Sequence, residues 1–210
     1  MLQRFRAEDG IVVRKEVHMA DPSDDIADRH LGVCRTFADH VRVVGEHWHS
    51  RSPCREWDAR GVLEHVIGFH DVLLLRPLGA KPPRPKDDPV GRWTVTLEAL
   101  DRLFRRPGLF DGAVDVPPVG NDPPTRVDAA RLVPMLSLDV LVHTWDLARA
   151  TGHEVALDPR LCDVFLRDLP TDETALAKTG MYDGPRAAPA DSDPQTKLLA
   201  RLGRDPDWCP

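Results

Sequence analysis

The most informative part of this chain is the run Leu138-Asp139-Val140-Leu141-Val142-His143-Thr144-Trp145-Asp146-Leu147, whose apolar spacing is that of a helix. Asp139 and His143 are four residues apart, so on a helix their side chains share one face, about 6 Å apart. Apolar residues lie on or beside that face, which predicts that it turns toward the core: Met135, Leu136, Val142 and Leu147. Burying an unpaired carboxylate costs several kcal/mol. A divalent cation would compensate Asp139 and also take the imidazole of His143 as a ligand.

A third candidate ligand is His65, in the amphipathic helical segment predicted over residues 58–76. Val62, Val66 and Phe69 lie three and four residues from it, so it too is expected to face inward. Three protein ligands with an open position are typical of a catalytic metal site rather than a closed structural one. The residues alone leave one alternative open, in which Asp139 and His143 form an ion pair and His65 is a hydrogen-bonded core residue.

Four long amphipathic segments are expected, over residues 23–50, 58–76, 90–106 and from 126 or 128 to 151. Shorter helices are predicted at 159–169 and 196–202. Residues 107–125 are rich in Pro and Gly and predict an irregular connection. Strand-like alternation is nearly absent. The pattern therefore predicts an all-α protein, an antiparallel four-helix bundle with short peripheral helices.

The length of 210 residues fits one domain. Residues 1–22 lack periodicity and are expected to form a flexible leader, with Met19 as an alternative start to Met1. Residues 23–210 are expected to form a single metal-binding helical domain. Whether that domain is a monomer or a homodimer is left open by the sequence.

Composition excludes several classes of partner. The formal net charge of −6 gives no general attraction to nucleic acid. No apolar run approaches the roughly 20 residues of a membrane span. The four cysteines are scattered without a C-x-x-C pair, which argues against a disulfide framework or a thiolate zinc site. Without a recognisable signal peptide, the expected compartment is the cytoplasm and the expected partner a small-molecule substrate.

Three motifs resemble those of one superfamily. The runs Ser52-Pro53-Cys54-Arg55-Glu56-Trp57-Asp58 and Leu63-Glu64-His65-Val66-Ile67-Gly68 resemble its (T/S)-P-C-x-x-W-D … H-V-x-G stretch. The run from Asp139 to Gly152 resembles (E/D)-x-x-x-H-x-W-D-L-A-x-A-x-G, and that from Leu198 to Pro206 resembles L-L-A-x-x-G-R-x-P. On these residues the chain resembles the DinB-like metal-binding superfamily. The similarity is to the stand-alone actinobacterial branch related to the N-terminal domain of mycothiol-dependent maleylpyruvate isomerase.

The resemblance implies a four-helix bundle that binds one divalent ion through His65, Asp139 and His143. The implied ion is Zn²⁺, with Ni²⁺ and Fe²⁺ as alternatives. The implied activity is a thiol-linked isomerase or S-transferase, with mycothiol as co-substrate and the metal activating a thiolate or water. Two departures from the family bear on the thiol rather than on the metal. Asp139 stands where the thiol-dependent isomerases usually carry Glu, and no second α/β domain is expected after the bundle.

The sequence also leaves other functions open. A metal-dependent lyase or cyclase acting on a secondary metabolite, and a non-catalytic metal- or small-ligand-binding module, are the alternative functions. No catalytic residue is assigned, and His70 and Asp146 are the candidates for the pocket. His70 is expected to face a loop or solvent rather than to border the cavity, because five residues place it well off the direction of His65. Asp146 is expected either to orient His143 or to cap a loop, and Cys54 to be a packing residue rather than a reactive thiol.

Overall fold

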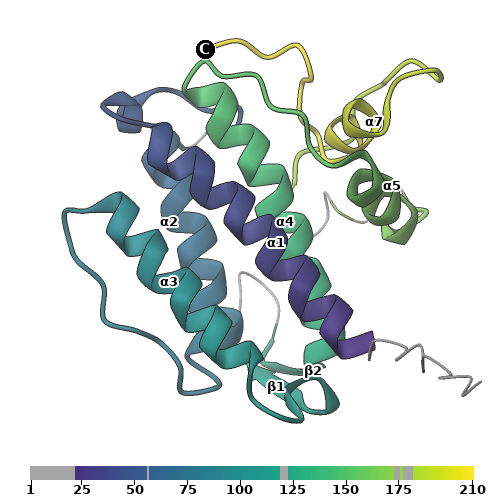
Figure 1. The fold of residues 1–210 in the computed structure, drawn as a ribbon. Helices are drawn as coiled ribbons and strands as arrows, with labels where there is room; N and C mark the ends of the chain where they lie inside the picture. The colour runs from purple at the N-terminus through teal and green to yellow at the C-terminus, as the bar shows by residue number, and fades with distance from the viewer. Residues whose placement is uncertain (1–21, 56, 119–122, 173–175, 177–181) are drawn as a thin grey trace, which may run out of the picture.

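The computed structural model describes residues 22–210 except 56, 119–122, 173–175 and 177–181. The predicted leader and the alternative start at Met19 lie outside the described residues, apart from Pro22 at the beginning of α1. The described chain is mostly helical, with α1 (Pro22–Val43), α2 (Ala59–His70), α3 (Pro89–Phe104), α4 (Ala129–Ala150), α5 (Pro159–Asp168) and α7 (Pro194–Arg201) (Figure 1). Within these residues, no helix is both long enough and apolar enough to cross a membrane.

The four long helices pack side by side, with α1 and α2 each contacting both α3 and α4 (Figure 1). α1 runs opposite to α3, since Phe37 meets Trp93 and His30 meets Phe104, and α2 likewise runs opposite to α4. However, α1 and α4 run in the same direction, as do α2 and α3. The expectation of antiparallel neighbours is wrong for these two pairs, because residues 76–88 carry the chain back to the end where α2 begins.

Local chemistry explains where the helices begin and end. The side chains of Asp58 and Asp88 accept hydrogen bonds from the third residue of α2 and α3, the amides of Gly61 and Gly91, each at 2.8 Å. These are the capping bonds expected of Asp before a helix. After α4, Gly152 adopts a left-handed backbone with φ of 74°, a conformation that L side chains rarely take. The predicted end of this helix at Gly152 is therefore confirmed.

A two-stranded antiparallel sheet precedes α4, formed by β1 (Ala113–Val116) and β2 (Thr125–Asp128). Residues 107–125 were expected to be irregular, and the all-α prediction is wrong at this point. The strands are only four residues long, and a Pro-rich connection separates them, so sequence alternation does not reveal them. Val114 and Val116 are both buried, which gives β1 one apolar face.

The connection after α2 is anchored rather than free. α2 continues into a π-helical turn, η2 (Asp71–Leu75), and the carboxylate of Asp71 accepts two hydrogen bonds from the Arg84 guanidinium, at 2.7 and 2.9 Å. Arg84 also donates to Thr96 of α3 at 2.7 Å, and its side chain is only 5% exposed. This ion pair holds the returning connection against α3.

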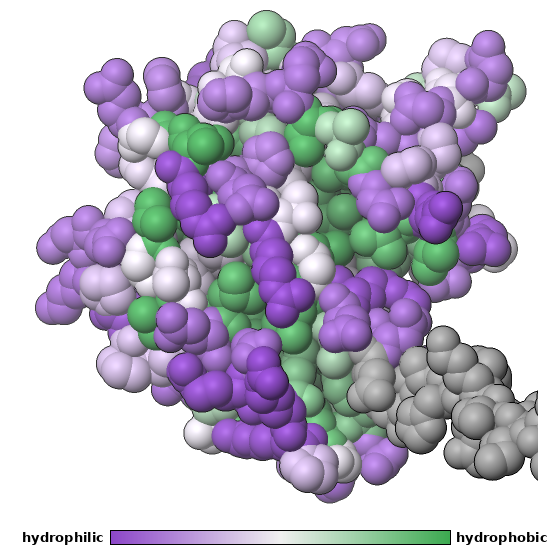
Figure 2. Space-filling view, in the orientation of Figure 1, coloured by the Kyte–Doolittle hydropathy of each residue, from purple (hydrophilic) through white to green (hydrophobic). Residues whose placement is uncertain are grey.

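The core lies where the four long helices meet. Trp93 and Phe37 are fully buried with their rings 4.8 Å apart and nearly perpendicular. Polar side chains cover much of the outer face, with apolar ones visible between the helices (Figure 2). Among the large apolar side chains that the structure describes, Met135 and Val43 are the exposed ones. Met135 was expected beside the inward face of α4, and its exposure shows that this face reaches solvent one turn before Asp139.

Candidate metal centre

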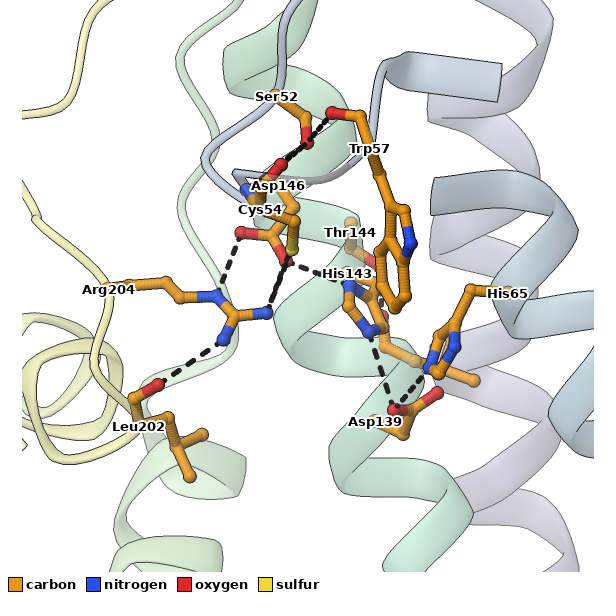
Figure 3. A network of polar contacts seen from close by, with 11 residues as sticks. Ser52, Cys54, Trp57, His65, Asp139, His143, Thr144, Asp146, Leu202 and Arg204 are labelled. Carbon is orange, nitrogen blue, oxygen red and sulfur yellow. Dashed lines mark hydrogen bonds and ion pairs between the residues drawn. The ribbon is translucent and has the colours of Figure 1, made fainter. Parts of the chain in front are cut away.

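α2 and α4 bring together the three predicted ligands, His65, Asp139 and His143 (Figure 3). Oδ1 of Asp139 lies 3.2 Å from Nε2 of His65 and 3.4 Å from Nε2 of His143. The side chains of Asp139 and His143 are 9% and 4% exposed, and that of His65 is 16% exposed. The centre is thus buried on the α4 side and reaches solvent at His65.

The donor set fits a metal ion in two independent respects. Ligand atoms bonded to Zn²⁺ at 2.0–2.1 Å in a tetrahedron lie about 3.4 Å from one another, close to both distances at Asp139. In addition, Oδ2 of Asp139 is buried and accepts no hydrogen bond from the residues that the structure describes. Buried carboxylate oxygens normally have a partner, and the described residues provide none for this atom.

The charges at the centre are strongly coupled. Burial acts to raise the pKa of Asp139, but the charge and hydrogen bonds of His143, together with those of His65, hold it well below the usual value. Burial acts to lower the pKa of His143, but Asp139 and Asp146 raise it well above the usual value. Asp139 and His143 therefore each stabilise the charged form of the other.

Asp146 orients His143 through the ring nitrogen that points away from Asp139, Nδ1. This is the first of the two roles expected for Asp146 from the sequence. Its Oδ2 lies 2.8 Å from Nδ1 of His143, which leaves Nε2 directed at Asp139 (Figure 3). A carboxylate on the second ring nitrogen fixes the tautomer and the direction of a metal-binding histidine. Asp146 is fully buried, so it does not line an open pocket.

Arg204 and Cys54 complete this polar network, and the sequence did not place either of them there. Arg204 donates from Nη2 to Oδ2 of Asp146 at 2.9 Å and to Sγ of Cys54 at 3.1 Å. Cys54, Asp146 and His143 also lie close enough together to hold an ion. The Arg204 guanidinium already provides the positive charge there, so this trio is disfavoured as a cation site. Burial and Asp146 raise the pKa of the Cys54 thiol.

Aromatic rings and one phenol border the centre. Trp57 stacks on His65 with ring centroids 4.4 Å apart, and Phe69 lies 4.3 Å from the same ring. Tyr182, the only tyrosine in the sequence, lies 5.9 Å from the Arg204 guanidinium carbon. Burial and the charge of Asp139 raise the pKa of Tyr182. Only its place in the tertiary structure indicates a role for Tyr182, since no motif surrounds it.

His70, the other pocket candidate, lies elsewhere. It is fully buried against His30 of α1 and Trp93 of α3, and the expectation of a side chain facing a loop or solvent is wrong. The helical phase correctly separated it from His65. However, α2 is covered on that side as well, by His30 of α1 and Trp93 of α3, whereas a single inward face was expected.

Comparisons with known proteins give relatives but no activity. No protein-family model and no solved structure matches the chain. Two proteins of Mycobacterium tuberculosis, the uncharacterized protein Rv0738 of strain H37Rv and the uncharacterized protein MT0763 of strain CDC 1551, are each 29% identical over 164 residues. The match covers 73% of this chain and 82% of each relative.

Proposed function

We propose that this protein is a divalent-metal-dependent enzyme of the DinB-like type, with Zn²⁺ bound by His65, Asp139 and His143. The observation that carries the proposal is the Asp139 carboxylate. One of its oxygens faces two imidazole nitrogens at 3.2 and 3.4 Å, and the other is buried without a partner among the described residues. Ni²⁺ and Fe²⁺ are the alternative ions, since both accept imidazole and carboxylate ligands.

The charge of the donor set indicates the class of ligand that would complete the site. Asp139 is the only carboxylate among the three proposed ligands, and the charge of Asp146 is balanced by Arg204. A divalent ion would therefore leave a net positive charge, which favours an anionic ligand such as a thiolate. When bound, the ion would lower the pKa of a thiol or water at its open position.

The surrounding residues would position the substrate and the ligands. Asp146 keeps His143 in one tautomer, and Arg204 keeps Asp146 charged and fixed. Trp57 and Phe69 flank His65, the ligand that reaches solvent, so the approach to the ion is partly apolar. An apolar wall beside a few directed polar groups is typical of small-molecule sites.

The helix arrangement supports a DinB-like four-helix bundle, in which the helices run up, down, down and up. A thiol-linked isomerase or S-transferase using mycothiol is the reaction class we favour. The net positive charge expected at the ion is consistent with it, while the alternatives are a lyase or cyclase on a secondary metabolite and a binding module without turnover. We further propose a cytoplasmic location.

Metal analysis of the untagged protein tests the ligand assignment. His65→Ala, Asp139→Ala and His143→Ala should each lose one equivalent of metal per chain while keeping most of the helical circular dichroism. The exposed residue His47 gives the matched control, and His47→Ala should keep the full metal content. Wild-type metal content in His143→Ala would overturn the assignment.

A thermal-shift screen of the metal-loaded protein tests the reaction class. Low-molecular-weight thiols and aromatic acids should raise the melting temperature of the wild type but not of His143→Ala. Stabilisation by thiols followed by turnover of a thiol conjugate supports the isomerase or transferase. Metal binding with no response to any thiol would overturn the thiol-linked reaction.

A further inference from the structure

A second cluster of metal-ligand side chains lies apart from the centre described above. His30 and Cys34 of α1 and His70 at the end of α2 have no exposed surface. Their three ligand atoms lie within 4.8 Å of one another. None of these residues belongs to the first set of ligands, so the two clusters can be tested separately.

The distances in this cluster are those of a tetrahedral site. Nε2 of His30 lies 3.1 Å from Nε2 of His70 and 3.5 Å from Sγ of Cys34. Around Zn²⁺, with Zn–N near 2.0 and Zn–S near 2.3 Å, two nitrogens lie about 3.4 Å apart and a nitrogen and a sulfur about 3.5 Å apart. Both contacts therefore lie within a few tenths of an ångström of the expected edges.

The outer nitrogen of each ring is held so that the inner one faces the cluster. Nδ1 of His70 lies 2.6 Å from the carbonyl oxygen of Val66, which can only accept, so Nδ1 carries the hydrogen. Nδ1 of His30 lies 2.9 Å from the hydroxyl of Ser137, and that hydroxyl donates to the carbonyl of Val133 at 2.8 Å. Each histidine thus turns a lone pair toward the other, which is unfavourable unless a cation lies between them.

A shared proton is the competing occupant of this place. It would make one of the two imidazoles cationic in a fully buried position, and burial lowers the pKa of both His30 and His70. Rotation of the Ser137 hydroxyl would instead let His30 donate directly to His70. Neither arrangement uses the thiol of Cys34 as a ligand, so a metal–sulfur bond distinguishes metal binding from both.

We propose that His30, Cys34 and His70 form a second metal site, which takes a borderline-soft divalent ion of the Zn²⁺ class. Binding would transfer the Cys34 proton to solvent and form one metal–sulfur and two metal–nitrogen bonds. All three side chains are buried, so an ion bound there would tie α1 to α2, where Ser137 of α4 meets them. It extends the proposed function and does not depend on it.

Titration of the metal-free full-length protein with Co²⁺ tests the site, because a thiolate ligand gives Co²⁺ a near-ultraviolet charge-transfer band. The wild type should bind two equivalents and show the band. Cys34→Ser should bind one equivalent without the band, whereas His143→Ala should bind one equivalent and keep it. Cys162→Ser is the matched control, since Cys162 is also a fully buried cysteine but lies on α5 and belongs to neither cluster, and it should keep both equivalents and the band.

Two results would overturn the proposal. One is a Cys34→Ser protein with the band and stoichiometry of the wild type, and the other is a single equivalent in the wild type that His143→Ala abolishes. The second result would leave the first centre intact, so the two proposals fail in different ways. Should Cys34→Ser not fold, zinc X-ray absorption of the Cys54→Ser protein decides: one sulfur for every two zinc ions supports the site, and none overturns it.

Discussion

Asp146 and Arg204 lie 58 residues apart in the sequence and form a two-point ion pair inside the protein. Nη2 of Arg204 is 2.9 Å from Oδ2 of Asp146, and Nε is 3.2 Å from Oδ1. Because the same Oδ2 lies 2.8 Å from Nδ1 of His143, the C-terminal segment of the chain controls the orientation of a proposed metal ligand. The C-terminal segment that contains Arg204 is therefore part of the proposed site.

Asp146→Asn should weaken metal binding without removing a ligand. The amide keeps the shape of the side chain but loses the charge that fixes the His143 tautomer, so we expect roughly a 10- to 100-fold loss of affinity. Competition with a chromophoric chelator measures it. The exposed pair of Asp39 and Arg42 gives the control, because Asp39→Asn should leave the affinity unchanged. Equal affinities in the two variants would contradict the role of Asp146.

Arg204→Met should destabilise the protein by about 3–5 kcal/mol, because it leaves the fully buried Asp146 carboxylate without its cation. Urea unfolding of the metal-free protein measures the loss. Arg102 forms an exposed pair with Glu98, in which the side chains are 64% and 60% exposed. Arg102→Met should therefore cost less than about 1 kcal/mol. Similar losses in both variants would count against a buried ion pair.

The same pair predicts a loss of stability in acid. Burial acts to raise the pKa of Asp146, but Arg204 and His143 hold it well below the usual value. Because the folded pKa is depressed, the stabilisation is present above the ordinary carboxyl pKa near 4 and is lost as the pH falls below it. Urea midpoints of the metal-free protein from pH 7 to pH 3 should fall more steeply than those of Asp146→Asn. Parallel profiles would refute this.

Metal removal should lower the melting temperature, because an ion that binds only the folded chain stabilises it by mass action. At free metal about 100 times the dissociation constant, the gain is about 2.7 kcal/mol for one site. For a chain of this size, that stabilisation corresponds to a rise in melting temperature of roughly 5–10 °C. Scanning calorimetry with chelator and with Zn²⁺ measures it, and Mg²⁺, which prefers oxygen ligands, should give no comparable shift. A melting temperature unaffected by chelator and Zn²⁺ would contradict metal binding.

Much of the candidate metal centre was predictable because its residues are fixed by local spacing. Asp139 and His143 are one helical turn apart, so any helix over this segment brings them together, and the observed α4 ends within one residue of the prediction. His65 could be added because its apolar neighbours indicate which side of α2 is buried. The three side chains then meet as soon as α2 packs against α4.

The predictions that were wrong concern contacts between distant segments. The β1–β2 pairing depends on two short runs on either side of a Pro-rich connection, and hydrogen bonds across such a gap leave little periodicity. The directions of α1 and α4 depend on how residues 76–88 return, which the Arg84–Asp71 ion pair helps to hold. Neither the pairing of the two strands nor the directions of the helices can be predicted from the spacing of neighbouring residues.

The amino-acid pattern alone thus predicted a mainly helical chain and the three candidate ligands His65, Asp139 and His143, because helical periodicity and side-chain spacing act over a few residues. Only the tertiary structure brings Arg204 next to Asp146 and Cys54. The same is true of the cluster formed by His30, Cys34 and His70. Each of these contacts joins residues of different helices or loops. The side chains meet because burying the apolar faces of the helices fixes how those helices lie against one another.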